Sequence, residues 1–413
     1  MWFAGIDWAD KQHDVVVLDA MGQRLSTRRY PHSAEGRASL TIDWRGLGAS
    51  PEEVVCVVEM RQGLLIAALR EAGLWVAPVT PKTVDRTRPA SGAKSDPLDA
   101  LLLARAGRRN WPDLRRLQPD SPLRADLKAL TRDQASLIRQ QTRLVNHLTA
   151  CLKAYYPVAL ALFDKLTRPV AQAFLSAFPT LEEARAASEE EVQQVLRTAR
   201  CPASAHKAAR FCAILRRAQL AASPALARAK ARAKARYALA LVAQLALIHQ
   251  HLLEYDRALG KLFHQHADRA LFASLPGAGR RLAPRLFAEW GEDRSRFSSA
   301  TQLQALAGTA PVVVQSGASR RGRQRTGCVK PLRAALYQLA RESLLFEDWA
   351  AAYYRRKRQE GKRARRTRWR CAPYPIALSN HWLRLLYARW SRGEVYQRER
   401  FLVAQQAHAQ SAA

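Results

Sequence analysis

The run Val54–Met60, with the sequence VVCVVEM, constrains the fold more than any other segment. Four of its first five residues are valine, and an apolar run so rich in β-branched residues is typical of a strand buried on both faces. Leu64–Ala72 then has the composition of a helix, Gly73 stops it, and Leu74–Val79 reads as another strand. Strand, helix and strand at this spacing predict a βαβ unit with a right-handed crossover, and therefore an α/β fold.

The residues before this unit also predict strands. The apolar runs Trp2–Ala9 and Val15–Leu18 are followed by a turn at Met21–Gly22 and by a third strand, Arg24–Tyr30. Together they predict a three-strand meander. A helix over Asp96–Arg109 is expected after a loop rich in Gly, Ser and Lys.

The middle of the chain has a helical repeat. Leucines recur there at three-, four- and seven-residue steps: Leu127, Leu130, Leu137, Leu144, Leu148 and Leu152. This spacing predicts a long amphipathic helix over 121–156 with coiled-coil tendency. Shorter helices are expected over 158–222 and a second long helix over 224–265. The two long helices are expected to pair as an antiparallel arm or to contact another subunit.

The C-terminal part opens at 271–292 with a helix, a Pro-Gly-Ala-Gly turn and a second helix, which resembles a helix-hairpin-helix. In such a turn the backbone N–H groups of Gly277 and Gly279 can approach phosphate, although similar turns also join purely structural helices. A helix is expected over Pro331–Leu345. The segment 355–370 is strongly basic, with a single acid, and precedes an apolar helix at Ile376–Trp390. It is interpreted as a segment that contacts a nucleic-acid backbone.

These elements predict three domains and a tail. An α/β domain is expected over 1–115, a helical and coiled-coil region over 116–270, a mainly helical C-terminal domain over 271–400, and a tail over 401–413. A chain of 413 residues is long enough for two or three such domains.

Charge narrows the class of partner. The chain has 67 Lys and Arg against 35 Asp and Glu, a formal net charge of +32, while 48% of its residues are hydrophobic. The hydrophobic share argues for a folded protein and the charge for nucleic-acid binding. A ribosomal-type or membrane-surface protein is the alternative. No apolar run is long enough to span a bilayer, and the N-terminus lacks the basic region of a signal peptide.

The six cysteines are scattered and form no C-x-x-C pair, which argues against a zinc site and for free thiols in a reducing cytoplasm.

Four carboxylates, Asp7, Glu59, Asp96 and Asp99, stand at the ends of predicted strands or at the start of a predicted helix. If the fourth strand lies beside the first, Asp7 and Glu59 become neighbours, and the two helical acids share one helix face. Oxygen ligands of this kind suit Mg²⁺, with Mn²⁺ as a possible substitute. Two such ions about 4 Å apart can clamp a phosphodiester during displacement.

Each acid also has a structural interpretation. Asp96, Pro97 and Asp99 fit a helix start with Asp at the N-cap, Pro at N1 and Asp at N3. Asp7 fits an acid at a strand end. Glu59 is harder to explain in this way, because a carboxylate that ends an apolar strand is costly unless it is paired or bound to metal. Weaker candidates for the site are Asp10, Asp14 and Asp19.

In this order, the four acids resemble those of the DEDD insertion-sequence transposases of the IS110 family. The segment from SLPGAGRR to LYQLA, within 271–345, is similar to the C-terminal transposase domain of that family. The resemblance covers roughly the first 110 residues and 271–345. It implies an RNase H-like (RuvC-like) N-terminal domain, a divalent-metal site formed by the four acids, and a DNA transposase or recombinase.

The resemblance also implies a serine nucleophile, Ser316 of the Ser-Gly motif, that attacks the DNA backbone and forms a phosphoserine linkage. Such covalent catalysis keeps the bond energy in an ester, so strands can be rejoined. Ser319 is the competing nucleophile, Ser316 alone could be a turn residue, and Cys328 departs from the usual end of this loop. The residues assigned to nucleic-acid binding are Arg320, Arg321, Arg323, Arg325, Lys330, Gly277, Gly279 and Arg280.

The partners that the resemblance implies are donor and target DNA and a noncoding guide RNA from the element. A homodimer or homotetramer in the bacterial cytoplasm, associated with the nucleoid, is expected. Two other functions remain open: a hydrolytic nuclease of the Holliday-junction resolvase or RNase H type, which needs the acids but no serine, and a non-catalytic nucleic-acid-binding scaffold.

Overall fold

The computed structural model describes residues 1–46, 50–61, 63–85, 95–114, 116–118, 120–217, 224–317, 319–362 and 374–403. Contacts between residues divide the chain into two units, Met1–Ser121 and Pro122–Ala413. Each unit is considered by itself.

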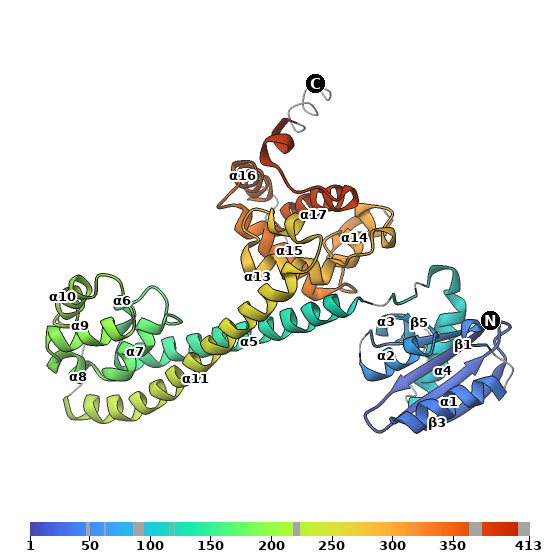
Figure 1. Cartoon of the computed structure of the whole chain (residues 1–413), viewed down its shortest axis with the longest axis horizontal. Helices are drawn as coiled ribbons and strands as arrows, with labels where there is room; N and C mark the ends of the chain where they lie inside the picture. Colours follow the sequence, from blue (N-terminus) through green and yellow to red (C-terminus); the bar gives the residue numbers. More distant parts are fainter. Residues whose placement is uncertain are drawn as a thin grey trace. The chain divides into compact units, whose positions relative to one another are not determined.

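The first unit is built on a five-stranded sheet in the order β3-β2-β1-β4-β5 (Figure 1). The strands are β1 (Trp2–Trp8), β2 (Gln12–Leu18), β3 (Arg24–Pro31), β4 (Val54–Val58) and β5 (Trp75–Pro78). β1, β2 and β3 form the predicted antiparallel meander, while β4 runs parallel to both β1 and β5. The fourth strand lies beside the first, which is the condition under which Asp7 and Glu59 become neighbours.

Helices cover both faces of this sheet. They are α1 (Ala34–Gly46), α2 (Leu64–Glu71), α3 (Pro81–Asp85) and α4 (Asp96–Arg109). Side chains of α1 and α2, such as Leu40 and Leu69, pack with Ile6 on one face, whereas Leu103 of α4 packs with Phe3 on the other. All five residues of β4 are buried, as predicted for a strand covered on both sides.

Two elements of the first unit differ from expectation. β2 begins at Gln12 rather than Val15, because His13 and Asp14 continue the pairing with β1 and Gln12 pairs with Pro31 of β3. α1 is not among the predicted helices. Only Gly36, Leu40 and Trp44 of this helix are buried, four residues apart among polar side chains, so its apolar signal is weak.

The second unit is mainly helical. Its helices are α5 (Pro122–Tyr155), α6 (Ala159–Leu162), α7 (Pro169–Ala177), α8 (Leu181–Ala186), α9 (Glu189–Thr198), α10 (Ser204–Leu215), α11 (Pro224–His264), α12 (Arg269–Ala273), α13 (Gly279–Trp290), α14 (Ala300–Ala307), α15 (Lys330–Ser343), α16 (Asp348–Lys362) and α17 (Tyr374–Arg392). Two strands, β6 (Val312–Ser316) and β7 (Ser319–Arg323), form an antiparallel ribbon. Among the helices of the described ranges, none is long and apolar enough to cross a membrane.

The long helices α5 and α11 run antiparallel, side by side (Figure 1). Gln134 of α5 donates a 2.8 Å hydrogen bond to Asp256 of α11, whereas the Cys151 thiol, further along α5, donates to the Lys234 carbonyl, earlier in α11. Of the two arrangements expected for these helices, the structure shows the antiparallel arm within one chain.

Each end of this arm is continuous with a hydrophobic core. Leu152 and Leu245 belong to a core shared with the helices α6 to α10. At the other end, Leu127 and Leu259 belong to a core shared with the helices α12 to α17. The arm therefore joins both cores in one unit. The boundary between the two units lies at 121/122. The domain division predicted at 270/271 falls inside the second unit, and it stays a prediction.

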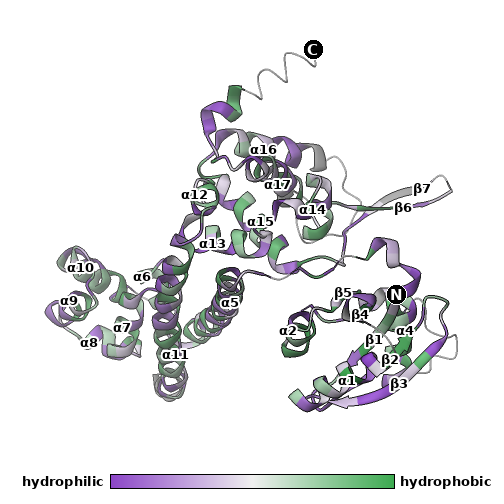
Figure 2. Ribbon diagram, turned by 45° about the vertical axis from the view of Figure 1, so that its right-hand side comes forward, coloured by the Kyte–Doolittle hydropathy of each residue, from purple (hydrophilic) through white to green (hydrophobic). Residues whose placement is uncertain are grey.

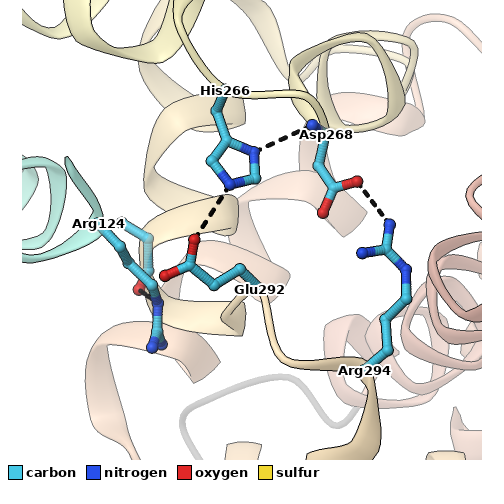
Figure 3. Close-up of polar contacts among 6 residues, drawn as sticks. Arg124, His266, Asp268, Glu292 and Arg294 are labelled. Carbon is cyan, nitrogen blue, oxygen red and sulfur yellow. Dashed lines mark hydrogen bonds and ion pairs between the residues drawn. The ribbon is translucent and has the colours of Figure 1, made fainter. Parts of the chain in front are cut away.

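Polar contacts tie the chain that leaves α11 to the end of α13 (Figure 3). His266 contacts Glu292 at 3.2 Å through Nε2, and its Nδ1 accepts a hydrogen bond from the Asp268 backbone at 3.0 Å. Arg294 donates to the Asp268 carboxylate at 2.6 Å and to the Trp390 carbonyl at 2.9 Å. These contacts connect the end of the arm with α13 and α17.

Candidate active site

The predicted acids of the first unit lie at one end of the sheet. β1 and β4 are parallel, with Ile6 opposite Val58, so Asp7 and Glu59 each follow that pair by one residue. Successive residues of a strand point to opposite faces, and Asp7 shares its face with Gly5, which contacts α4. A pocket of 160 Å³ at this end is lined in part by Asp7 and Glu59.

Two glycines let α4 lie directly on the sheet. A Cβ added at Gly5 of β1 would stand 2.0 Å from the Ala100 carbonyl oxygen, and one added at Gly107 of α4 would stand 2.3 Å from a methyl group of Val57. No side chain larger than hydrogen fits at either position. This close contact sets the N-terminal turn of α4, with Asp96 and Asp99, beside the end of β1.

These acids are close enough for their charges to act on one another. Burial, followed by the charges of Asp99, Asp96, Glu59 and Asp14, raises the pKa of Asp7 from 3.8 to about 6. Like charges gathered in a partly buried place repel one another unless a cation neutralises them. Oxygen donors alone make this a set suited to a hard divalent cation.

Asp14, a weaker candidate by sequence, lies beside Asp7 in the structure. It lies directly opposite Asp7 in the register of β1 and β2, is 6% exposed, and accepts a 3.2 Å hydrogen bond from Arg29. The start of β2 and its register with β1, which set Asp14 opposite Asp7, do not follow from the local sequence. The sequence feature that could have indicated the longer strand is the polar segment Gln12–Asp14, which directly precedes the apolar run Val15–Leu18.

The helix-cap interpretation of Asp96 is wrong by one residue. Ser95 occupies the N-cap, Asp96 is the first residue of α4, and Pro97 follows within the first turn. Asp96 is exposed and Asp99 is half-buried, and both acids favour the positive end of the helix dipole. Among the described residues, no group of three His, Cys, Asp or Glu side chains is arranged as it stands to hold a metal ion.

The predicted serine lies in the second unit, on the ribbon of β6 and β7. Ser316 ends β6 and pairs with Ser319 of β7 across a turn in which Gly317 has φ +54°. Both serines are exposed, so the position of each allows it to reach a substrate. The ribbon extends from the surrounding helices (Figure 2), and Val312, Val313 and Val314 of β6 are 36%, 50% and 41% exposed.

Basic residues follow the serine. The side chains of Arg320 and Arg321 lie outside the described residues, Arg323 and Lys330 are exposed, and Arg325 is half-buried. Cys328 fills the space beneath Gly308, where an added Cβ would stand 2.6 Å from its sulfur. The departure at Cys328 is therefore a packing contact.

The turn expected to resemble a helix-hairpin-helix joins a five-residue helix, α12, to α13. Gly277 has φ +75°, and a Cβ there would stand 2.7 Å from Glu342 of α15, so packing as well as backbone conformation favours glycine. Gly279 faces open space with φ +51°, and the Arg280 side chain is 75% exposed and 3.6 Å from Asp256. These contacts are enough to explain why residue 277 is a glycine. Its expected role in phosphate binding is not needed for that explanation and stays a prediction.

The first unit has an acidic site at one end of an α/β sheet, and the second unit is basic and carries the predicted serine. These features define a DNA-processing enzyme of the DEDD transposase class. Comparison with known proteins leads to the same class. A family model described as a transposase, DEDD_Tnp_IS110, matches residues 4–157, and one described as Transposase IS116/IS110/IS902 family matches 269–355.

Relatives match across most of the chain. The "Mini-circle putative transposase for IS117" of Streptomyces coelicolor is 32% identical over 368 residues, which cover 87% of this chain and 88% of the relative. The "Insertion element IS900 uncharacterized 42 kDa protein" of Mycobacterium paratuberculosis is 27% identical over 379 residues, covering 87% and 90%. The chain belongs to the IS110 family of transposases. The resemblance described from its motifs is thereby confirmed, and the protein is a DNA transposase.

Proposed function

We propose that this transposase cuts and rejoins DNA through a covalent serine intermediate assisted by divalent metal, Mg²⁺ or Mn²⁺. The observation that carries the proposal is the convergence of Asp7, Glu59, Asp96 and Asp99 at one sheet edge, where their charges act on one another. The strand order and directions support an RNase H-like (RuvC-like) domain, because three antiparallel strands are followed by parallel strands beside the first.

The four acids are the groups that would hold the metal. A bound divalent ion supplies Lewis-acid stabilisation of charge on the phosphodiester. The residues themselves provide oxygen donors from two strand ends and a helix start. Glu59 and Asp96 are exposed, so their side chains can change rotamer to complete a shared coordination sphere. Asp14, held by Arg29, adds negative charge beside Asp7 from the neighbouring strand.

In the covalent step, the Ser316 Oγ forms a bond to phosphorus while one P–O bond to a deoxyribose breaks. The hydroxyl proton is lost to a base, and the departing sugar oxygen takes a proton to become a hydroxyl. The ester keeps the bond energy, so a second sugar hydroxyl can attack the phosphoserine and rejoin the strand. Arg323 and the other arginines of the ribbon can offset the charge that develops on phosphate.

The test is an adduct assay. Wild-type protein incubated with element-end DNA and Mg²⁺ should give a protein–DNA adduct that survives denaturation. Ser316→Ala should give none, whereas Ser319→Ala, the matched change across the turn, should retain it. Asp7→Asn and Glu59→Gln should lower adduct formation about 100-fold or more, since several kcal/mol of charge stabilisation is lost.

The outcome that contradicts the serine mechanism is free cut ends, undiminished in Ser316→Ala. That outcome favours the second candidate function, a metal-dependent hydrolytic nuclease, for which the acids of the first unit would suffice. Binding without cutting in the wild type would instead favour a non-catalytic scaffold.

We further propose that the enzyme acts in the bacterial cytoplasm as a dimer or tetramer on donor and target DNA with a noncoding guide RNA. The net charge of +32 supports binding of more than one nucleic-acid strand. Mixing Asp7→Asn with Ser316→Ala tests subunit sharing: restored activity shows that subunits contribute different residues. RNA sequencing of the purified complex tests the guide, because only an RNA encoded by the element would support it.

A further inference from the structure

A second basic site lies on α17, apart from the residues assigned to catalysis. Its pocket of 250 Å³ is lined by side chains that recur along one face of the helix, and the lining contains no acidic side chain. The polar and aromatic groups in the lining are His381, Arg384, Arg389, Arg392 and Phe401. Three guanidinium groups therefore surround a small concave surface.

Two of these arginines are available to a ligand. Arg384 and Arg392 are exposed, and neither forms an ion pair within the described part of the chain. They are eight residues apart, so they span about 12 Å along the helix. Arg389 differs, because it is mostly buried and pairs with Glu394. A concave surface with two uncompensated cations favours an anion with more than one charged group.

An aromatic side chain closes the pocket. The Phe401 ring lies 4.8 Å from the Trp349 ring and 6.0 Å from His381, so neighbouring rings fix its position. Close by, the guanidinium of Arg356 lies 5.3 Å from the ring of Tyr353, whose own ring is 5.6 Å from His381. Aromatic rings interleaved with arginines form the kind of platform on which unpaired bases stack.

We propose that this pocket binds one unpaired nucleotide of a single-stranded nucleic acid. The base stacks against Phe401, and the phosphates on either side of it pair with Arg384 and Arg392. The bases of a duplex are already stacked and leave no free face for Phe401. An acidic peptide does not regularly place an aromatic ring between two anionic groups, so both ligands fit less well. The proposal does not depend on the serine mechanism, since none of these residues takes part in it.

Binding can be measured without cutting by using Ser316→Ala protein and a fluorescent oligothymidylate in the absence of divalent metal. Arg384→Gln and Arg392→Gln should each weaken binding about threefold to tenfold, and each should lower the slope of log affinity against log salt by about 0.7. Arg197→Gln, which removes an exposed arginine on α9, is the matched control and should change neither quantity.

The aromatic contact has its own test. Phe401→Leu keeps an apolar side chain beside Trp349, so the fold should be retained, as circular dichroism can verify. Wild-type protein should bind oligothymidylate about tenfold more tightly than an abasic strand of equal length, and Phe401→Leu should lose most of that difference. An oligonucleotide carrying 5-iodouracil should crosslink to Phe401 or His381, as peptide mass spectrometry can show.

Several outcomes would overturn the proposal. They are equal affinity of the wild type for abasic and base-bearing strands, crosslinks only outside this pocket, and affinity losses seen with duplex but not with single strands. The same losses on an RNA strand of matching sequence support it, because stacking and phosphate pairing need no 2′-hydroxyl. A failed adduct assay would leave these binding results unchanged, so the two proposals fail separately.

Discussion

At the scale of single residues, Asp7 shows how the fold changes the chemistry of a side chain. Its pKa is raised to about 6 by burial and by four neighbouring acids, chief among them Asp99. The residue types and their order along the chain were enough to name Asp7, Glu59, Asp96 and Asp99 as candidates for one site, and the structure brings them to one end of the sheet. Asp14 could not be ranked with them, because its position depends on strand register, which no local pattern specifies.

The raised pKa of Asp7 predicts an unusual dependence of stability on pH. Between about pH 4 and pH 6 the folded protein holds this proton more tightly than the unfolded chain, so stability contributed by the proton is lost as pH rises through 6. Without divalent metal, the first unit should therefore unfold at a lower temperature at pH 7.5 than at pH 5.5. Asp7→Asn should reduce this difference, by on the order of 1 kcal/mol after screening by solvent.

Calorimetry with and without Mg²⁺ measures both effects. Mg²⁺ at pH 7.5 should raise the unfolding temperature of the wild type, because a ligand that binds only the folded state stabilises it. Asp7→Asn should respond weakly, whereas Asp113→Asn, which changes an acid that follows α4, should respond as the wild type does. An equal response of all three proteins would mean that the acids bind no metal.

At the scale of elements, the site depends on how closely α4 approaches the sheet. The helix itself could be predicted from its sequence, since Ser95 and Pro97 mark its start. The distance of α4 from the sheet could not be predicted from the sequence. Gly5 and Gly107 permit the close contact, but in the sequence alone each is an isolated glycine within a strand or a helix. The same limit applies to α1, whose burial rests on so few apolar residues.

Gly5→Ala should therefore damage the site without touching an acid. The added methyl group overlaps the Ala100 carbonyl, so α4 has to move outward or the first unit loses stability, by about 1–3 kcal/mol or more. Gly46→Ala is the matched control, because a Cβ at Gly46 meets no heavy atom within 4 Å. Urea unfolding and the shift induced by Mg²⁺ measure the two consequences, and wild-type values for both in Gly5→Ala would contradict this account.

At the scale of the whole molecule, the chain is two units whose stabilities need not be coupled. The second unit is held together where the arm meets α13: Asp256 of α11 is 8% exposed and receives both a 2.8 Å bond from Gln134 and a bidentate pair from Arg281 at 2.7 Å. Both long helices were predicted from the sequence, the first of them from its leucine spacing. The spacing could not predict this contact, which joins three helices far apart in sequence.

Asp256→Ala should lower the stability of the second unit by about 2 kcal/mol or more, because the half-exposed Arg281 guanidinium and the buried Gln134 amide lose their shared partner. Glu254→Ala, which breaks the exposed contacts with His251 and Gln250, should change stability by about 0.5 kcal/mol or less. Differential scanning calorimetry should show the loss in the transition that does not respond to Mg²⁺. A shift of the Mg²⁺-sensitive transition instead would show that the units unfold together.

The exposed valines of β6 have a consequence for the protein before it meets nucleic acid. A two-stranded ribbon leaves strand edges open, and β6 presents Val312, Val313 and Val314 to solvent. An open apolar edge invites strand pairing between copies. We therefore expect the unbound protein, with this ribbon uncovered, to aggregate more readily than protein whose ribbon is covered by nucleic acid.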